Sequence, residues 1–381
     1  MKGEAEFEAA LGAANVPGAV ALITDSTGTR YLRAFGMADA VAGVPMREDS
    51  LFQIASMTKA LTSAAVLQLV ERGRLDLDEP VGALLPELAD PQVLEGFDEA
   101  GAPRLRPARG AVTLRHLLMH TSGCGYAFMD ADLLRHAMAS GNMVPGTRKS
   151  LDMPLLFDPG ERWQYGTGID WAGLAVEAVS GMSLGQWFEQ ELTGPLGMTA
   201  TRFRADWDAG EAQVHARQED GGFALQPMVL GGGEYHNGGG GLSWTASDYG
   251  RFLRMVLRGG ELDGVRVLSP ESAQISRTDA LPPHIAAGRM TSAMPGFATE
   301  FDPLPGQRGG WTLGGFLVNT ETGPAGRSPG SLHWSGIFNS YYWIDLERDL
   351  AGVILTQIAP YADPGALSAF AALEAMACAN G

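Results

Sequence analysis

The sequence predicts an α+β protein whose antiparallel sheet is built from both ends of the chain. Residues 17–35 are typical of two strands joined by a turn at Asp25–Gly28. Two further strand patterns, 331–345 and 350–357, lie near the C-terminus. The residues between these ends are dominated by helical patterns. Strands at both ends of a mainly helical segment indicate a sheet domain that carries an inserted helical domain.

The helical patterns have clear limits. The expected helices cover about Ser56 to Arg72, 170–180, about 247–258 and 363–379, and Gly73 and Gly181 are suited to end the first two. Residues 76–235 are mainly helical in pattern, and 282–330 are rich in glycine and proline. We therefore expect an α/β domain of residues 1–80 plus 236–381 and an inserted helical domain of residues 81–235.

Seven glycines surround residues 234–237 within the segment 231–241. A phosphate-binding loop would end in Gly-Lys-Ser or Gly-Lys-Thr, and this segment does not. A tight backbone crossing or a flexible loop is the better interpretation.

Composition excludes several classes of function. The chain has 381 residues, 45% of them hydrophobic, and its 27 basic against 44 acidic side chains give a net charge of -17. Such a charge repels nucleic acids and anionic membrane surfaces. No apolar run is long enough to span a bilayer, and the acidic start does not resemble a secretory signal. With only Cys124 and Cys378, the sequence predicts reduced thiols and a cytoplasmic protein.

Lysine is rare in this chain, and one lysine stands in an unusual place. Only three of the 27 basic residues are lysine, and Lys59 is the sole ionisable side chain between Ser50 and Val70. The surrounding helix is apolar on nearly every face, which predicts burial. Burial disfavours an ammonium ion, so the pKa of Lys59 is expected to fall toward the range of a useful base.

Ser56 precedes Lys59 by three residues, so the hydroxyl and the amine share one helix face. Ser56 also opens the helix, where free backbone N–H groups can receive a developing oxyanion. This pattern indicates a nucleophile, its activating base and part of an oxyanion hole. The alternative is a helix cap at Ser56 beside a lysine that reaches out to solvent.

A second site lies at residues 157–168, where a Pro-Gly turn places Tyr165 near the tip of a loop. A phenol becomes a usable proton shuttle when a nearby lysine stabilises its phenolate. The glycines on both sides of Thr167 are expected to admit a substrate, and Thr167-x-x-Asp170 has the spacing of a capping box. The alternative role of Tyr165 is aromatic packing.

The third site is the strand pattern at residues 331–338. Gly336 within it suggests a close backbone approach, by a ligand for example. The N–H of Ile337, the next residue, is expected to point at the same oxyanion as that of Ser56.

Together these sites resemble serine hydrolases of the class C β-lactamase and penicillin-binding-protein type, especially the family VIII carboxylesterases. The family motifs correspond to Ser56-Met-Thr-Lys59, Tyr165-Gly-Thr167 and Trp334-Ser-Gly336, in the family's order. Further family marks are present, namely His120-Thr-Ser-Gly123, Phe157-x-Pro-Gly160 and Pro195-Leu-Gly-Met198. The resemblance covers about residues 15–375.

The resemblance implies a β-lactamase/transpeptidase-like fold with the active site between its two domains. Ser56 would attack an acyl carbonyl, Lys59 and Tyr165 would carry the proton, and the N–H groups of Ser56 and Ile337 would hold the oxyanion. We expect substrate contacts from the following residues: Tyr126, His333, Trp334, Ser335 and Gly336. No cofactor is expected. His116 and His120 stand four residues apart, as paired zinc ligands can, but no glutamate follows His116 as in a metalloprotease, so no metal site is expected either.

Two departures from the lactamase pattern guide the choice of substrate. Trp334 and Thr167 stand where lactamases carry the lysine and asparagine that help hold an antibiotic's carboxylate and amide. The change removes an anion anchor and favours an uncharged small-molecule ester with a short or aromatic acyl group. The alternatives are acyl transfer, amide hydrolysis, β-lactam hydrolysis, or a non-catalytic scaffold. The sequence leaves the oligomeric state open.

Overall fold

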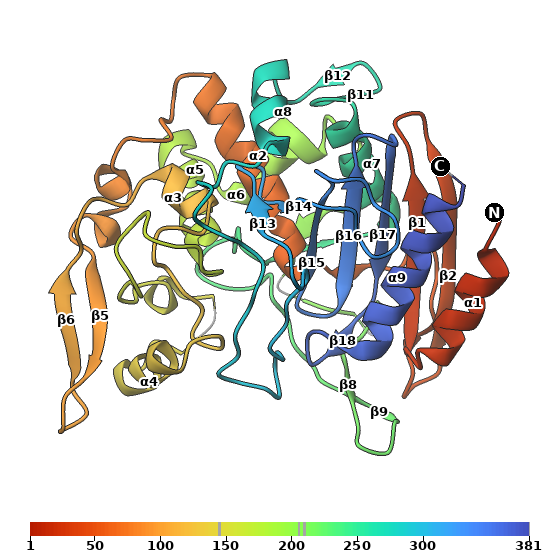
Figure 1. Ribbon diagram of the computed structural model, residues 1–381, viewed down its shortest axis with the longest axis horizontal. Coiled ribbons are helices and arrows are strands. Elements are labelled where there is room, and N and C mark those ends of the chain that lie inside the picture. Colours follow the sequence, from red (N-terminus) through yellow and green to blue (C-terminus); the bar gives the residue numbers. More distant parts are fainter. Residues whose placement is uncertain (144–145, 205, 209–210, 381) are drawn as a thin grey trace.

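The computed structural model describes residues 1–143, 146–204, 206–208 and 211–380. Its centre is an antiparallel sheet, to which the described residues contribute eight strands (Figure 1). From edge to edge the strands are β13 (Gly309–Trp311), β14 (Leu317–Asn319), β15 (Leu332–Gly336), β16 (Ser340–Asp345), β17 (Leu350–Leu355), β1 (Gly18–Thr24), β2 (Thr29–Asp39) and β3 (Val44–Pro45).

Both ends of the chain build this sheet, as predicted. The N-terminal strand β1 pairs with β2 on one side and with the C-terminal strand β17 on the other. The β1–β2 turn forms because the Asp25 carboxylate accepts the N–H groups of Thr27 and Gly28. Every residue of β1, β16 and β17 is buried, as in a sheet covered on both faces.

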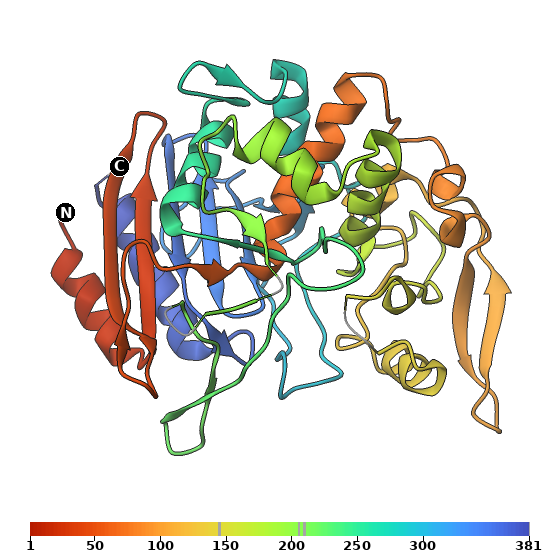
Figure 2. The ribbon, with the colours of Figure 1, turned by 180° about the vertical axis from the view of Figure 1, so that it is seen from behind.

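Helices cover the two faces (Figures 1 and 2). On one face α9 (Pro364–Cys378) lies on β17 and packs against α1 (Glu4–Ala13); from the other, α7 (Ala246–Leu257) contacts β1 and β17. Asp363 caps α9 by accepting the N–H of Ala366, and Pro364 occupies the first turn, where its missing N–H costs nothing. The helices expected at 247–258 and 363–379 are confirmed.

The helix α2 (Thr58–Glu71) contacts α5 (Gly168–Ser180), α6 (Leu184–Phe188) and α8 (Pro270–Arg277). Two further helices are α3 (Leu114–Leu118), which contacts α5, and α4 (Ala131–Ser140). The helix expected at 170–180 is confirmed as α5, which ends at Gly181 in the left-handed conformation.

The segment 81–235 also contains strands. β5 (Gln92–Phe97) and β6 (Pro103–Pro107) form a protruding hairpin (Figure 1). Two later strands of the segment pair with strands outside it. β7 (Arg202–Phe203) pairs with β10 (Leu242–Trp244), which also pairs with β4 (Phe52–Gln53). β8 (His215–Arg217) pairs with β9 (Phe223–Leu225) inside the segment and with β18 (Ile358–Ala359) outside it. A small hairpin, β11 (Glu261–Leu262) with β12 (Val265–Arg266), follows α7. The domain limits stay a prediction.

The structure differs from the expected strands in two places. The stretch 331–345 is a hairpin rather than one strand, because the chain turns between β15 and β16 at residues 337–339. Asn339 adopts the left-handed conformation there, and its side-chain amide donates to the carbonyls of Ile358 and Pro360. The glycine-rich stretch 282–330 also supplies the edge strand β13 and its neighbour β14, which its composition concealed.

Two helix starts also differ. The predicted helix at Ser56 begins as a 3₁₀ turn, Ala55–Met57, and becomes α-helical at Thr58. Thr167 does precede α5, but its side chain makes no capping hydrogen bond, so the capping-box interpretation was wrong.

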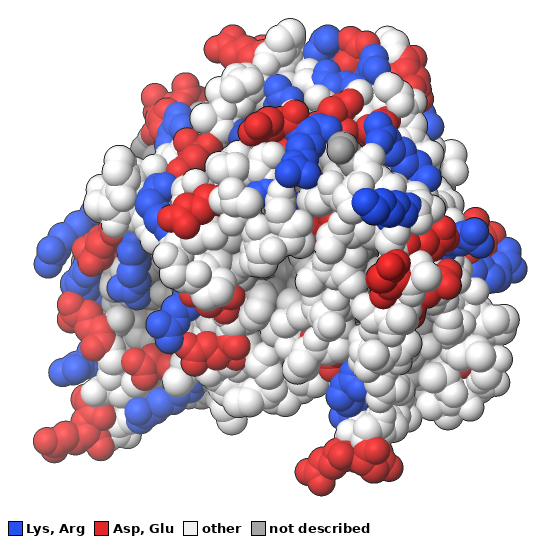
Figure 3. All heavy atoms as spheres, turned by 45° about the vertical axis from the view of Figure 1, so that its right-hand side comes forward, with Lys and Arg blue, Asp and Glu red and all other residues white. Residues whose placement is uncertain are grey.

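On the face shown in Figure 3, acidic and basic side chains are mixed within the same regions. Broad uncharged areas lie between these charged regions. Among the described residues, no helix combines the length and the apolar character needed to cross a bilayer.

Candidate active site

Ser56 lies in the 3₁₀ turn that leads into α2. The residue before it, Ala55, is buried and has a φ of 47°, a left-handed conformation that costs an alanine about 1–2 kcal/mol. The strand β15 packs against this turn so closely that a Cβ on Gly336 would lie 2.4 Å from the carbonyl oxygen of Ile54. The close approach predicted at Gly336 therefore exists, and the group that makes it is the protein's own backbone; the approach of a ligand at Gly336 stays a prediction.

Lys59 is fully buried, one turn after Ser56. Its Nζ donates to the carbonyl of Gly239 at 2.6 Å and to the Tyr126 hydroxyl at 2.9 Å, and lies 3.3 Å from the Ser56 Oγ. The structure thus brings the predicted nucleophile and amine together in a water-poor environment. Burial lowers the pKa of Lys59 to about 8, although the negative charge of Asp170 acts in the opposite direction.

Asp170 is a buried carboxylate that sequence reasoning noticed only as a possible cap. Its two oxygens accept the N–H of Gly239 at 3.1 Å and the hydroxyl of Tyr126 at 3.3 Å. Burial raises the pKa of Asp170, while Lys59 and these donors lower it. The carboxylate therefore acts on the amine of Lys59 through its charge and through two residues that contact both groups, namely Gly239 with its backbone and Tyr126 with its hydroxyl.

The glycine-rich segment makes this arrangement possible. A Cβ on Gly239 would lie 2.2 Å from Oδ2 of Asp170, so no larger residue fits there without displacing the carboxylate. The neighbouring Gly238 carbonyl accepts a hydrogen bond from Thr62 on α2. In the same segment a Cβ on Gly233 would lie 2.5 Å from the carbonyl oxygen of Gly146, which confirms the interpretation as a tight backbone crossing. Its function, to carry a carbonyl to Lys59, gave no signal in the sequence.

Tyr165 reaches the same point from the loop before α5. The Nζ of Lys59 lies 4.8 Å from the centre of its ring, and its hydroxyl accepts a hydrogen bond from the Trp334 indole at 3.2 Å. Burial raises the pKa of Tyr165, and the Ser56 hydroxyl and the Trp334 indole only partly offset it. Tyr165 is therefore a neutral phenol at rest, and the expectation of a lysine-stabilised phenolate has no support here.

The glycines that flank Thr167 serve packing. A Cβ on Gly166 would collide with the carbonyl of Cys124, and one on Gly168 with the carbonyl of Leu117. They let the chain approach its own backbone, not a substrate as expected. Sequence alone does not distinguish these two reasons for a glycine.

His120, part of a secondary family mark, lies directly beneath the site. Its ring centre is 4.8 Å from that of Tyr165 and 5.0 Å from that of Trp311. Burial, together with the positive charge of Lys59, lowers the pKa of His120 well below its usual value. It acts as a neutral ring that supports Tyr165.

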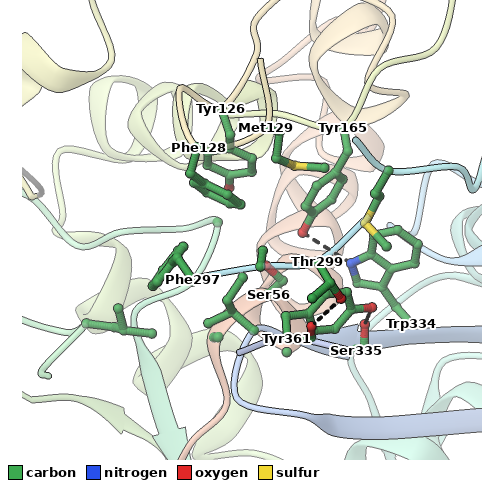
Figure 4. Close-up of a pocket in the computed structure, with 18 of the residues that line it drawn as sticks. Ser56, Tyr126, Phe128, Met129, Tyr165, Phe297, Thr299, Trp334, Ser335 and Tyr361 are labelled. Carbon is green, nitrogen blue, oxygen red and sulfur yellow. Dashed lines mark hydrogen bonds between the residues drawn. The ribbon is translucent and has the colours of Figure 1, made fainter. Parts of the chain in front are cut away.

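A pocket of about 140 Å³ opens beside Ser56 (Figure 4). Its walls are mostly aromatic and aliphatic, and in Figure 4 the Ser56 side chain lies between an upper group containing Tyr126 and Tyr165 and a lower group containing Thr299 and Tyr361. The larger aliphatic and phenylalanine side chains that line it are Phe128, Met129, Leu230, Met290, Phe297 and Ile337. No lysine or arginine is among the described lining residues.

The predicted binding residues fall into two groups. Tyr126, Trp334, Ser335 and Gly336 line this pocket, as does Ile337, whose N–H in the β15–β16 turn has no backbone acceptor in the described part of the chain. His333 does not line it. His333 lines a second cavity behind Trp334, and its strand neighbours Trp334 and Ser335 line both cavities.

Comparisons with known proteins agree with this geometry. A sequence model of the family described as beta-lactamase matches residues 4–377. The chain belongs to the beta-lactamase family. The fold expected from the resemblance is thereby confirmed.

Relatives of this beta-lactamase-family protein act on acyl groups, by their names. It is 35% identical to a monacolin J acid methylbutanoyltransferase of Aspergillus terreus over 382 residues, covering 95% of this chain and 91% of the relative. It is 33% identical to a lovastatin esterase of Penicillium rubens over 369 residues, covering 91% and 90%. The LovD6 mutant of simvastatin synthase from Aspergillus terreus superposes with a TM-score of 0.85 and 33% identity, covering 99% of this chain and 94% of that one.

Proposed function

We propose that this protein forms an acyl-enzyme at Ser56 and transfers a small acyl group from an ester to a hydroxyl acceptor. The observation that carries the proposal is the buried Lys59 amine, 3.3 Å from the Ser56 hydroxyl and beside an apolar pocket. An amine with a pKa of about 8 is partly neutral near pH 7, and can therefore accept a proton from a hydroxyl.

In the acylation step, Lys59 takes the Ser56 proton while Oγ bonds to the acyl carbon and the carbonyl electron pair moves to oxygen. The N–H groups of Ser56 and Ile337 are the proposed donors to that oxyanion. When the tetrahedral intermediate collapses, the bond to the leaving oxygen breaks and Tyr165 gives that oxygen a proton. The ammonium of Lys59 supplies the compensating proton to the phenolate, and the acyl-enzyme remains.

The acceptor repeats these steps in reverse, and its nature decides the net reaction. Water gives a carboxylic acid, as expected at first from the sequence, and an alcohol gives a new ester. The apolar walls at Phe128, Phe297 and Met290 favour the hydrocarbon part of an alcohol over water. The methylbutanoyltransferase relative supports transfer, and the lovastatin esterase relative keeps hydrolysis as the second candidate.

Hydrolysis of β-lactam antibiotics fits the pocket less well. Their carboxylate needs a cationic or strongly donating partner, and no described lining residue of the pocket is a lysine or arginine. At the position of the lactamase lysine, Trp334 directs its indole N–H to Tyr165 instead.

The test compares the two acceptors directly. The protein is incubated with p-nitrophenyl butyrate and increasing 1-butanol, and butyl butyrate and butyric acid are both quantified. We expect the ester to become the main product while nitrophenol release does not fall. Butyric acid as the sole product at every butanol concentration would favour the esterase.

Ser56→Ala tests the acyl-enzyme itself. We expect this variant to lose turnover and the butyryl mass adduct seen by intact-mass spectrometry. Ser63→Ala is the matched control, because Ser63 is a buried serine of α2 that does not line the pocket. An adduct that persists in Ser56→Ala would contradict the proposal. A small-molecule ester as substrate and the cytoplasm as location remain predictions.

A further inference from the structure

A second cavity lies behind the wall of the active-site pocket. It has a volume of about 170 Å³ and shares Trp334, Ser335 and Tyr361 with that pocket. Its other walls come from β15, β16, α9 and the loops around residues 301–303 and 324–327. The acyl-transfer steps described above use none of the residues found only in this cavity.

Some residues that line this cavity carry buried polar atoms for which the described part of the chain offers no hydrogen-bond partner. Arg327 is 3% exposed, and its Nη1 has no hydrogen-bond partner among the described residues. Its Nε lies 2.8 Å from Oε1 of Glu374, in an ion pair that lacks hydrogen-bond alignment. The Nε2 of His333 is likewise buried and without a described partner. Buried groups of this kind require water or a ligand to satisfy them.

The rest of the cavity is hydrocarbon. Phe301, Pro303, Leu367 and Phe370 line it beside the polar end. A cavity of about 150 Å³ accommodates benzene, so this one has room for a ligand of roughly six heavy atoms. The site therefore offers a guanidinium to one end of a small molecule and apolar walls to the other.

We propose that this cavity binds a short monocarboxylic acid, whose carboxylate accepts hydrogen bonds from Arg327 and His333 while its alkyl chain lies against Phe370 and Leu367. A guanidinium is the side chain best matched to a carboxylate. The proposal concerns a site distinct from Ser56 and does not depend on the acyl-enzyme, although ester hydrolysis would produce a ligand of this class.

The charges around the cavity make such binding depend on pH. Glu374 on α9 and Asp345 on β16 are the carboxylates near Arg327, and Arg348 is the second cation of the group. The other titratable groups are Cys378, His333, Tyr341 and Tyr361. Burial and Arg327 lower the pKa of His333, and burial raises the pKa of both tyrosines, which stay neutral phenols. Because the two cations already balance the two carboxylates, an added anion leaves a buried negative charge. Glu374, whose pKa burial raises, is the group placed to take up a proton.

The experiment measures butyrate binding by calorimetry in the full-length Ser56→Ala variant, so that no turnover interferes. We expect affinity to rise by at least about tenfold between about pH 8 and about pH 5.5, with proton uptake, because binding is linked to protonation of the site. Butyramide, which has the same size without the charge, should bind at least about tenfold more weakly near pH 5.5. Equal binding of the amide would overturn a carboxylate site.

Variants locate the binding. Arg327→Met/Glu374→Met removes the ion pair without leaving an unpaired charge, and should abolish butyrate binding. Arg266→Met/Glu261→Met is the matched control, because it removes a surface ion pair in the β11–β12 hairpin and should leave binding unchanged. Binding that survives in the first double variant, or no binding in the parent (a cavity that holds only water), would refute the proposal.

Failure of this proposal differs from failure of the proposed function. A fluorophosphonate probe labels Ser56 only if that serine is nucleophilic, whereas the butyrate binding that Arg327→Met/Glu374→Met removes from the Ser56→Ala protein reports the second cavity. Labelling without butyrate binding would refute only the carboxylate site, and binding without labelling would refute only the acyl-enzyme.

Discussion

The protein buries two cations beside two carboxylates, on either side of the wall formed by Trp334, Ser335 and Tyr361. In one site Lys59 is near Asp170, and in the other Arg327 pairs with Glu374. Burial lowers the pKa of both cations and raises that of both carboxylates. The two sites share the same electrostatics, and they differ in the kind of cation and in what surrounds it.

That difference separates chemistry from binding. Burial in a protein can lower the pKa of an amine far enough for the amine to lose its proton, whereas a guanidinium stays protonated. The groups that contact the amine of Lys59 are the hydroxyls of Ser56 and Tyr126 and a carbonyl, and hydroxyls exchange protons readily. Arg327 faces a carboxylate and aromatic rings. Since the chain has only three lysines, the presence of one at the first site indicates that a cation able to lose its proton is needed there.

Exchanging the cations gives the largest expected effect. Lys59→Arg should lower kcat/KM for p-nitrophenyl butyrate about as far as Lys59→Ala, by on the order of 10⁴-fold, the upper range for loss of a general base. Arg327→Lys keeps the charge at the other site and should change kcat/KM by less than about tenfold. Circular dichroism confirms folding of each variant. An active Lys59→Arg would show that charge alone is required.

Removal of the phenol should have the next largest effect. Tyr165→Phe should cost roughly 10²–10⁴ in kcat, since it removes the proposed proton donor and leaves the ring in place. Tyr361→Phe makes the same change elsewhere in the pocket, where the hydroxyl contacts Ser335, and should cost less than about tenfold. Similar losses in the two variants, measured by steady-state kinetics, would remove the special role of Tyr165.

The Arg327–Glu374 pair should matter for stability. Arg327→Met leaves Glu374 buried without its partner, and should lower the free energy of unfolding by about 3–5 kcal/mol. Arg327→Met/Glu374→Met should recover most of this loss in urea denaturation. Arg266→Met breaks a half-exposed pair and should cost less than about 1 kcal/mol. If the single and double variants were equally unstable, the pair would not behave as a buried ion pair.

The smallest expected effect is a shift in pH dependence. In the proposed mechanism the neutral amine is the base, so kcat/KM should rise with pH and level off above the pKa of Lys59, about 8. Asp170 favours the ammonium form, so Asp170→Asn should move this rise to lower pH. Asp248→Asn replaces another buried carboxylate, which accepts a hydrogen bond from Thr201 and does not line the active-site pocket. This control variant should leave the pH profile unchanged. A shift to higher pH in Asp170→Asn would contradict the assignment.

Contacts between residues close together in the sequence were predictable, and contacts between distant segments were not. Ser56 and Lys59 are three residues apart, and helical geometry alone predicts that they meet. The end strands and helices were likewise readable from local patterns. The partners of Lys59 were not, because Tyr126, Asp170 and Gly239 come from three separate segments.

Glycines show the same limit. Gly336, Gly166 and Gly239 are each needed because another part of the backbone or a carboxylate approaches within 2.5 Å of where a Cβ would stand. The sequence shows that a side chain is missing, and it does not show which group occupies the space. His333 was misplaced for a related reason: β15 borders two cavities that share Trp334 and Ser335, and the sequence pattern does not show that His333 lines only the second.

The sequence alone determined that a serine hydroxyl stands beside a buried amine, at the start of an apolar helix within an α+β fold. Helix geometry and hydrophobic burial act over a few residues, so a local pattern contains them in full. Only the tertiary structure decided that Asp170 sets the charge around this amine, that Trp334 donates to Tyr165, and that a second buried cation lies behind the same wall. These contacts join residues far apart in the chain, and their geometry exists only once the core has packed.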